Sequence, residues 1–194
     1  MSSELESPTE AERSSGLLGH TIIRTYGAIV PAVPDQTLEH AGWGTGLAVS
    51  YGVARAIQLS LGLAYYQYEF TDAPDVDCDC SFLSRNAVRQ TTISVDLQSP
   101  GRSWLQPWLS AGFGVYEMTE TREAHSYPYR SVVSGTMLGA NWGMGVLARL
   151  DQRLAIDLGG RYHTTFGQPF LEPTGFWPQL DLFTVQAGLS YVIH

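Results

Sequence analysis

Apolar and polar residues alternate with period two over most of the chain from residue 17 onward. Such alternation is typical of β-strands with one apolar face, because successive side chains point to opposite sides of a strand. The last segment shows the pattern best. One face there is apolar and the other is small or polar: Phe183, Val185, Ala187, Leu189, Tyr191 and Ile193 against Thr184, Gln186, Gly188 and Ser190.

The same alternation predicts seven earlier strands, the first of them the poorest match. They lie at about residues 18–28, 43–53, 57–65, 91–97, 105–115, 138–148 and 154–166. Short turns at 54–56, 99–102 and 151–152 alternate with long polar links at about 30–41, 69–88, 119–133 and 167–179. This alternation predicts an all-β fold, an eight-stranded antiparallel up-and-down β-barrel with every long loop at one end.

Alternation alone does not say which face of the barrel is apolar. A soluble lipocalin-like carrier points its apolar face inward, whereas a transmembrane barrel points it outward. Here the polar face carries Gly, Ser, Thr, Gln and Asn, which suits a narrow lumen better than a surface in water. Aromatic residues stand mostly near strand ends, as a membrane interface requires. They favour the transmembrane barrel over the carrier: Trp43, Tyr51, Tyr65, Trp142, Tyr162, Phe166, Phe183 and Tyr191.

Composition narrows the classes of protein further. The chain is 44% hydrophobic and 15% charged, and its 11 basic residues are all arginine. A net charge of −8 argues against a nucleic-acid binder, since such proteins neutralise phosphates with basic residues. The most apolar stretch, 47–66, contains Arg55 and Gln58, unlike a transmembrane helix.

The first 16 residues are polar and acidic, without the apolar core of a secretory signal. We therefore expect a flexible tail at 1–16 and a barrel at 17–194, in an exported chain from which the signal has been removed.

Three segments of the C-terminal half carry a family resemblance: LQPWLSAGFGV at 105–115, LAIDLGGRY at 154–162 and VQAGLSY at 185–191. Over about residues 17–193 the chain resembles the small outer-membrane β-barrels of the OmpA/OmpX-like group of Gram-negative bacteria. Members of that group usually end on an aromatic residue, whereas this chain ends Tyr191-Val-Ile-His194. The resemblance implies an outer-membrane location, with outer-membrane lipid and lipopolysaccharide as partners, and says little about activity.

Strand parity places five ionisable residues on the lumen face: Arg24, Asp96, Asp157, Arg161 and His163. Unpaired charges in so narrow a space would be very costly. We interpret the five as a polar network that neutralises itself, and the alternative is a gate or a proton path. The barrel is expected to have no continuous pore, because eight strands leave room for side chains and little else.

The link at 72–80 concentrates carboxylates and both cysteines of the chain. Asp75, Asp77, Cys78, Asp79 and Cys80 are candidate metal ligands, although no histidine or second cysteine pair completes a zinc pattern. We interpret the link as a solvated acidic loop and expect no cofactor.

Aromatic residues also occur in the links at the long-loop end, at Tyr127, Tyr129, Phe170, Phe176 and Trp177. Exposed loop aromatics form recognition surfaces for an extracellular protein or a surface ligand. They equally suit the lipid headgroup boundary. We keep both alternatives.

The triplet His163-Thr164-Thr165 is similar to the His-x-Ser arrangement of outer-membrane lipid A deacylases, with Thr165 in place of the serine. It makes a lipid-modifying hydrolase an alternative function. The preferred expectation is a non-enzymatic barrel with a structural or surface-interaction role carried by its long extracellular loops.

Overall fold

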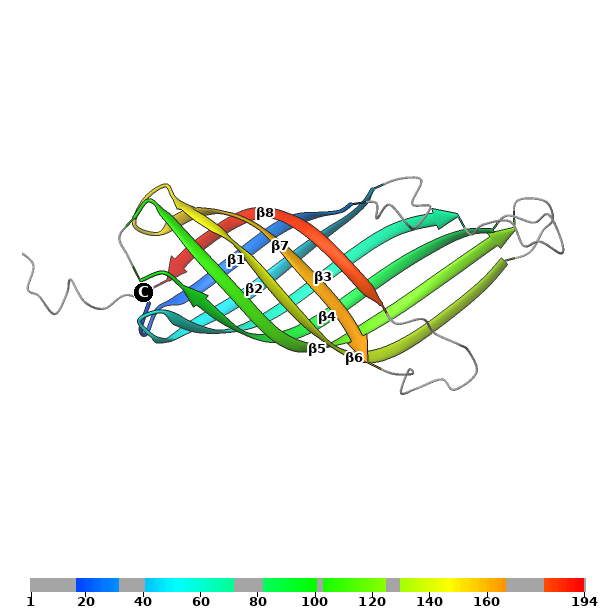
Figure 1. Cartoon of the computed structure of the whole chain (residues 1–194), viewed down its shortest axis with the longest axis horizontal. Coiled ribbons are helices and arrows are strands. Elements are labelled where there is room, and N and C mark those ends of the chain that lie inside the picture. The colour runs from blue at the N-terminus through cyan, green and yellow to red at the C-terminus, as the bar shows by residue number, and fades with distance from the viewer. Residues whose placement is uncertain are drawn as a thin grey trace, which may run out of the picture.

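The chain closes into a β-barrel in the computed structural model, which describes residues 17–31, 41–71, 82–100, 103–124, 130–166 and 180–193. Each strand pairs antiparallel with the next, and the last pairs with the first (Figure 1). The predicted fold class is therefore confirmed. The strands are β1 (Thr21–Val30), β2 (Gly42–Ala54), β3 (Ile57–Thr71), β4 (Phe82–Gln98), β5 (Leu105–Ala124), β6 (Arg130–Arg149), β7 (Leu154–Phe166) and β8 (Asp181–Ile193). Among the described residues, no helix is long and apolar enough to span a bilayer.

The outer wall of the barrel is apolar and its interior is largely polar. On β8, Phe183, Val185 and Leu189 are 43–50% exposed, whereas Thr184 and Gln186 are at most 4% exposed. A soluble carrier would have the opposite distribution, because its outer wall faces water. The outward apolar face predicted from the sequence is confirmed, and with it the transmembrane type of barrel.

The outward-facing apolar residues form a band around the barrel, the apolar belt. On β3 it runs from Ile57 to Tyr65, and on the paired β4 from Thr91 to Leu97. The stretch on β3 is as long as a tilted strand needs to cross the hydrocarbon core, about 9–11 residues, and the stretch on β4 is slightly shorter.

Four strands continue well beyond the belt, which corrects the predicted links at 69–88 and 119–133. β3 to β6 project past the other strands at the long-loop end (Figure 1). Outside the strands, only 72–81 and 125–129 connect them. Beyond the belt the outward face is polar, as at Arg85 and Thr119. The inward face mixes polar and apolar residues, as at Asn86 and Val88, so the hydropathy pattern stops. Backbone pairing continues, because it does not depend on the polarity of side chains.

At the opposite end the strands are joined by short turns, as predicted. In the β6–β7 turn, Asp151 Oδ1 accepts the backbone N–H groups of Arg153 at 2.6 Å and Leu154 at 2.7 Å. These two hydrogen bonds lower the pKa of the exposed Asp151 carboxyl below its usual value. A lowered pKa in the folded state means that the carboxylate stabilises the turn near neutral pH. That stabilisation is lost as the pH falls through the lowered pKa.

The apolar belt predicts that the cost of an outward charge depends on depth. Leu189 lies between Phe183 and Tyr191 on β8, and Thr119 faces outward on β5 beyond the belt. We expect Leu189→Arg to lower the free energy of unfolding by about 2–4 kcal/mol and Thr119→Arg by less than about 0.5 kcal/mol. Denaturant titration of barrels folded into vesicles measures both. Equal losses would contradict the position of the belt.

Candidate functional site: the filled lumen and the outer wall

A buried ion pair crosses the lumen between β1 and β4. Arg24 Nη1 lies 2.9 Å from Asp96 Oδ2, and neither side chain is more than 5% exposed. The other partners of Asp96 are hydroxyl groups, which Ser60 and Ser110 donate at 2.6 Å each. Arg24 Nη2 donates to Gln58 Oε1 at 2.8 Å. Such a dense set of hydrogen bonds is what a charge pair needs away from water.

Glutamine side chains continue this network toward the short-turn end. Gln58 Nε2 donates to Gln98 Oε1 at 2.7 Å, and Gln98 Nε2 donates to Gln106 Oε1 at 2.6 Å. The chain of amides runs across β3, β4 and β5, and all three glutamines are buried. This chain of amides occupies the lumen between the Arg24–Asp96 pair and the short turns.

The other two lumen charges are not paired with each other. Trp108, a buried residue on β5, donates its indole N–H to Asp157 Oδ1 at 2.8 Å. Its ring lies 5.5 Å from the Arg161 guanidinium carbon, a cation–π distance. Glycines make room for the indole, because a Cβ at Gly145 or Gly159 would lie 2.6 or 2.5 Å from the ring. The sequence analysis did not place Trp108 in the lumen.

His163 lies apart from the four charged residues. Its Nδ1 is 3.3 Å from the Tyr116 hydroxyl oxygen, and its ring centroid is 5.6 Å from that of Tyr66. The Thr165 hydroxyl accepts the backbone N–H of Leu180 at 2.9 Å. No hydrogen bond joins His163 to Thr165 within the described part of the chain. The contact that the structure gives the Thr165 hydroxyl is thus to the backbone before β8.

Toward the long-loop end the lumen is filled by apolar and aromatic side chains, which the sequence analysis missed. They come from β1, β3–β6, β8 and the residue before β8, and we refer to them as the apolar plug. Val88 and Met137 stand alone among polar or glycine neighbours of the same parity. The others come in pairs two residues apart, such as Tyr116 and Met118, so no long apolar run marks them. The plug comprises Ala28, Val30, Ala64, Tyr66, Val88, Tyr116, Met118, Met137, Leu180 and Leu182.

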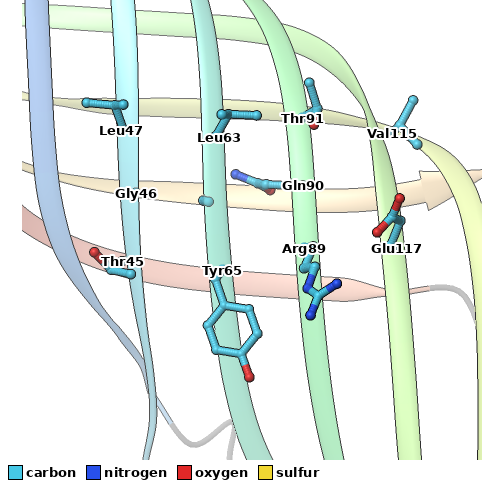
Figure 2. Close-up of a pocket in the computed structure, with 11 residues that line it drawn as sticks. Thr45, Gly46, Leu47, Leu63, Tyr65, Arg89, Gln90, Thr91, Val115 and Glu117 are labelled. Atoms are coloured by element: carbon cyan, nitrogen blue, oxygen red, sulfur yellow. The ribbon is translucent and has the colours of Figure 1, made fainter.

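On the outer wall, a groove of about 540 Å³ crosses β2 to β5 at the edge of the apolar belt. We refer to it as the outer groove (Figure 2). Belt residues line one half of it, among them Leu47 and Leu63. Tyr65, the last belt residue of β3, lines the other half together with Arg89 and Glu117, which lie beyond the belt. The groove therefore joins an apolar surface to a charged one.

Several candidates lie outside the described residues. These are the loop aromatics Tyr127, Tyr129, Phe170, Phe176 and Trp177, and the acidic link with Asp75, Asp77, Cys78, Asp79 and Cys80. Among the residues that the structure does describe, no group of His, Cys, Asp and Glu side chains is arranged to hold a metal ion.

The Arg24–Asp96 geometry predicts strong coupling between the two residues. Asp96→Asn leaves a buried guanidinium without its counter-charge, and we expect the free energy of unfolding to fall by about 3–5 kcal/mol. The double variant Arg24→Met with Asp96→Leu removes both charges, so we expect a loss smaller than the sum of the two single losses. The cycle consists of the wild type, the single variants Arg24→Met and Asp96→Leu, and the double variant, each measured by denaturant titration beside Asp96→Asn. Additive losses would show that the pair is not coupled.

Neither the protein-family models nor the characterised sequences with which the chain was compared include a match. Solved structures do match. Outer membrane protein OprG from Pseudomonas aeruginosa has a TM-score of 0.60 at 16% identity, over 92% of this chain and 98% of that one. A major outer membrane protein from Thermus thermophilus has a TM-score of 0.60 at 10% identity, over 89% of this chain and 99% of that one.

The attachment invasion locus protein Ail of Yersinia pestis, solved in complex with the heparin analogue sucrose octasulfate, also matches. Its TM-score is 0.55 at 13% identity, over 91% of this chain and 99% of that one. At such identities the likeness concerns the fold. The chain thus has the fold of the small outer-membrane β-barrels, in agreement with the resemblance seen in its sequence.

Proposed function

We propose that this chain is a non-conducting barrel of the bacterial outer membrane that holds its long connections at the cell exterior for contact with a surface partner. The observation that carries the proposal is an apolar outer wall around a lumen filled with side chains. In barrels of this kind the short turns face the periplasm and the long loops face outward. β3 to β6 would then project from the membrane into the external medium.

Packing along the whole lumen supports a closed barrel. Gln58 fills it near the short turns, and Asp96 fills it at the level of the ion pair, each 0% exposed. Tyr66, Tyr116 and Met137 of the apolar plug are likewise 0% exposed. A lumen of eight strands is just wide enough for side chains to fill, and these buried layers support a lumen without a continuous water path.

Aromatic residues at both edges of the belt support the membrane location. Trp43 stacks near Tyr65 at 5.7 Å between ring centroids, and Trp142 near Tyr162 at 4.7 Å. Tyr191 faces outward toward the opposite edge. Amphipathic rings at both boundaries form the girdles that anchor a barrel at the level of the headgroups.

The sequence of the long connections favours one class of partner. Within 32–40, 72–81, 125–129 and 167–179 there are carboxylates and aromatic rings but no arginine or lysine. Carboxylates repel sulfate and phosphate groups, so these loops suit a cationic or an uncharged surface. Ail, by contrast, was solved with a sulfated heparin analogue. The acidic residues concerned are Asp35, Glu39, Asp72, Asp75, Asp77, Asp79 and Glu172.

Reconstituted protein tests the closed barrel. We expect folded wild-type protein to migrate differently in gels before and after boiling, because closed strand pairing resists detergent. In planar bilayers it should give no conductance steps, whereas a porin inserted in the same way supplies the positive control. Regular single-channel steps from the wild type would contradict the closed lumen. Monodisperse protein in detergent-free buffer would contradict the membrane location.

The loop chemistry predicts that sucrose octasulfate does not bind. Titration calorimetry with the detergent-solubilised chain should show no saturable heat of binding, because the carboxylates of the long connections repel this polyanion. Saturable binding that weakens as salt rises would mean that an arginine surface near the loops dominates instead.

A further inference from the structure

The outer groove places an apolar surface and a cation side by side at the level where lipid headgroups begin. Leu47, Leu63 and Val115 are 40–51% exposed on its belt side. Arg89 extends from β4 on the other side, next to Tyr65 of β3, its partner in the strand register. A ligand that fills the groove must therefore combine an anionic group with an acyl chain.

Arg89 differs from the other arginines at the long-loop end of β3 to β6. Arg85 has Glu69 at 2.9 Å, Arg122 has Glu120 at 2.6 Å, and Arg130 has Glu123 at 3.6 Å. Within the described part of the chain, Arg89 makes no ion pair.

The carboxylate nearest to Arg89 in the strand register does not engage it. Glu117 lies directly opposite on β5. The two side chains nevertheless point in different directions in the groove (Figure 2). The Arg89 guanidinium is thus exposed at the belt edge with its donors unused by a carboxylate.

We propose that the outer groove binds the lipid A part of one lipopolysaccharide molecule, with a phosphate on Arg89 and an acyl chain along Leu47 and Leu63. The inference rests on the proposed function, which places the groove in the outer leaflet, where lipopolysaccharide resides. A guanidinium suits a phosphate because its planar donors match two phosphate oxygens at once. The Tyr65 ring lies at the depth that aromatic residues prefer beside headgroups.

Glu117 limits where the anion can lie. Its carboxylate repels a phosphate placed over β5, so the phosphate is confined to the β3–β4 side of the groove, beside Arg89. Glu117 is therefore expected to weaken the binding of the phosphate. A variant without the Glu117 carboxylate is expected to bind lipid A at least as tightly as the wild type.

Native mass spectrometry of the full detergent-solubilised chain tests the proposal with bis-phosphorylated lipid A as the probe. The wild type should retain one lipid A molecule. Arg89→Gln should weaken binding about tenfold, the effect of one charge-assisted contact. Arg85→Gln is the matched control on the same strand and face, already paired with Glu69, and should change binding less than about twofold. Glu117→Gln should bind as tightly as the wild type or more tightly.

A steric pair of variants tests the apolar half without altering charge. Leu63→Trp fills the groove and should reduce retention of lipid A, whereas Leu61→Trp, on the same strand face deeper in the belt, should not. Dephosphorylated lipid A and phosphatidylglycerol are the comparison probes, and both should bind more weakly than lipid A.

Two results would overturn the inference. One is equal loss of lipid A in Arg85→Gln and Arg89→Gln, and the other is phosphatidylglycerol bound as tightly as lipid A. The shift in gel mobility on boiling reports folding for every variant. If the wild type shows that shift and retains no lipid A, the groove assignment is wrong while the proposed function stands. If the wild type fails to insert into membranes, both are wrong.

Discussion

Inside a bilayer no water is available to the backbone, so each N–H and C=O group of a membrane strand needs a partner on a neighbouring strand. β1 and β8 each have one edge that no sequence neighbour covers, and their mutual pairing supplies the partners of that edge, from Thr21 opposite Ile193 to Ile29 opposite Val185. Closing a sheet of eight strands fixes a narrow lumen. The identity of almost every inward-facing residue follows from that width, because a side chain there must either interlock with its neighbours or be small.

The four charged residues that lie in the membrane-spanning part of the lumen, Arg24, Asp96, Asp157 and Arg161, are accommodated in two ways. Arg24 and Asp96 neutralise each other directly and share a shell of hydroxyl and amide groups. Arg161 and Asp157 are held apart by Trp108, whose indole N–H serves the carboxylate while its π face serves the guanidinium. One side chain thereby meets both charges, the carboxylate with its N–H dipole and the guanidinium with the quadrupole of its ring. The interior can be filled by an aromatic ring without leaving either ion bare.

Much of this arrangement was predictable from the sequence where hydropathy and strand parity point the same way. Alternation on 183–193 located β8 and its two faces, and the parity of Arg24 and Asp96 put them on the lumen face that the structure gives them. The strand ends were not predicted where strand parity continues but the outward face is no longer apolar. Beyond the belt, around Arg85 and Asn86, water replaces lipid outside, so strands continue without an apolar face.

Trp108 and the apolar plug were missed for a related reason. If the inward face is assumed to be polar, the pattern does not predict that an apolar residue such as Val88 points inward. A signal for Trp108 was present in the cross-strand direction. Gly145, its register partner on β6, and Gly159, the next residue across on β7, leave a hole of the size of an indole. Reading along one strand at a time cannot reveal such a hole, since it belongs to three strands.

The apolar plug and the outer groove are built from residues adjacent in the chain. The plug residues Tyr66, Val88 and Tyr116 point inward. Their chain neighbours Tyr65, Arg89 and Glu117 point outward into the groove. Pairing these strands one position out of register would exchange every pair at once. Arg89 would then enter the plug, and Val88 would stand among headgroups. Such a shift would bury charges and expose apolar side chains in several strands together. The side chains of β3 to β5 therefore fix the strand register at the end where the connections are longest.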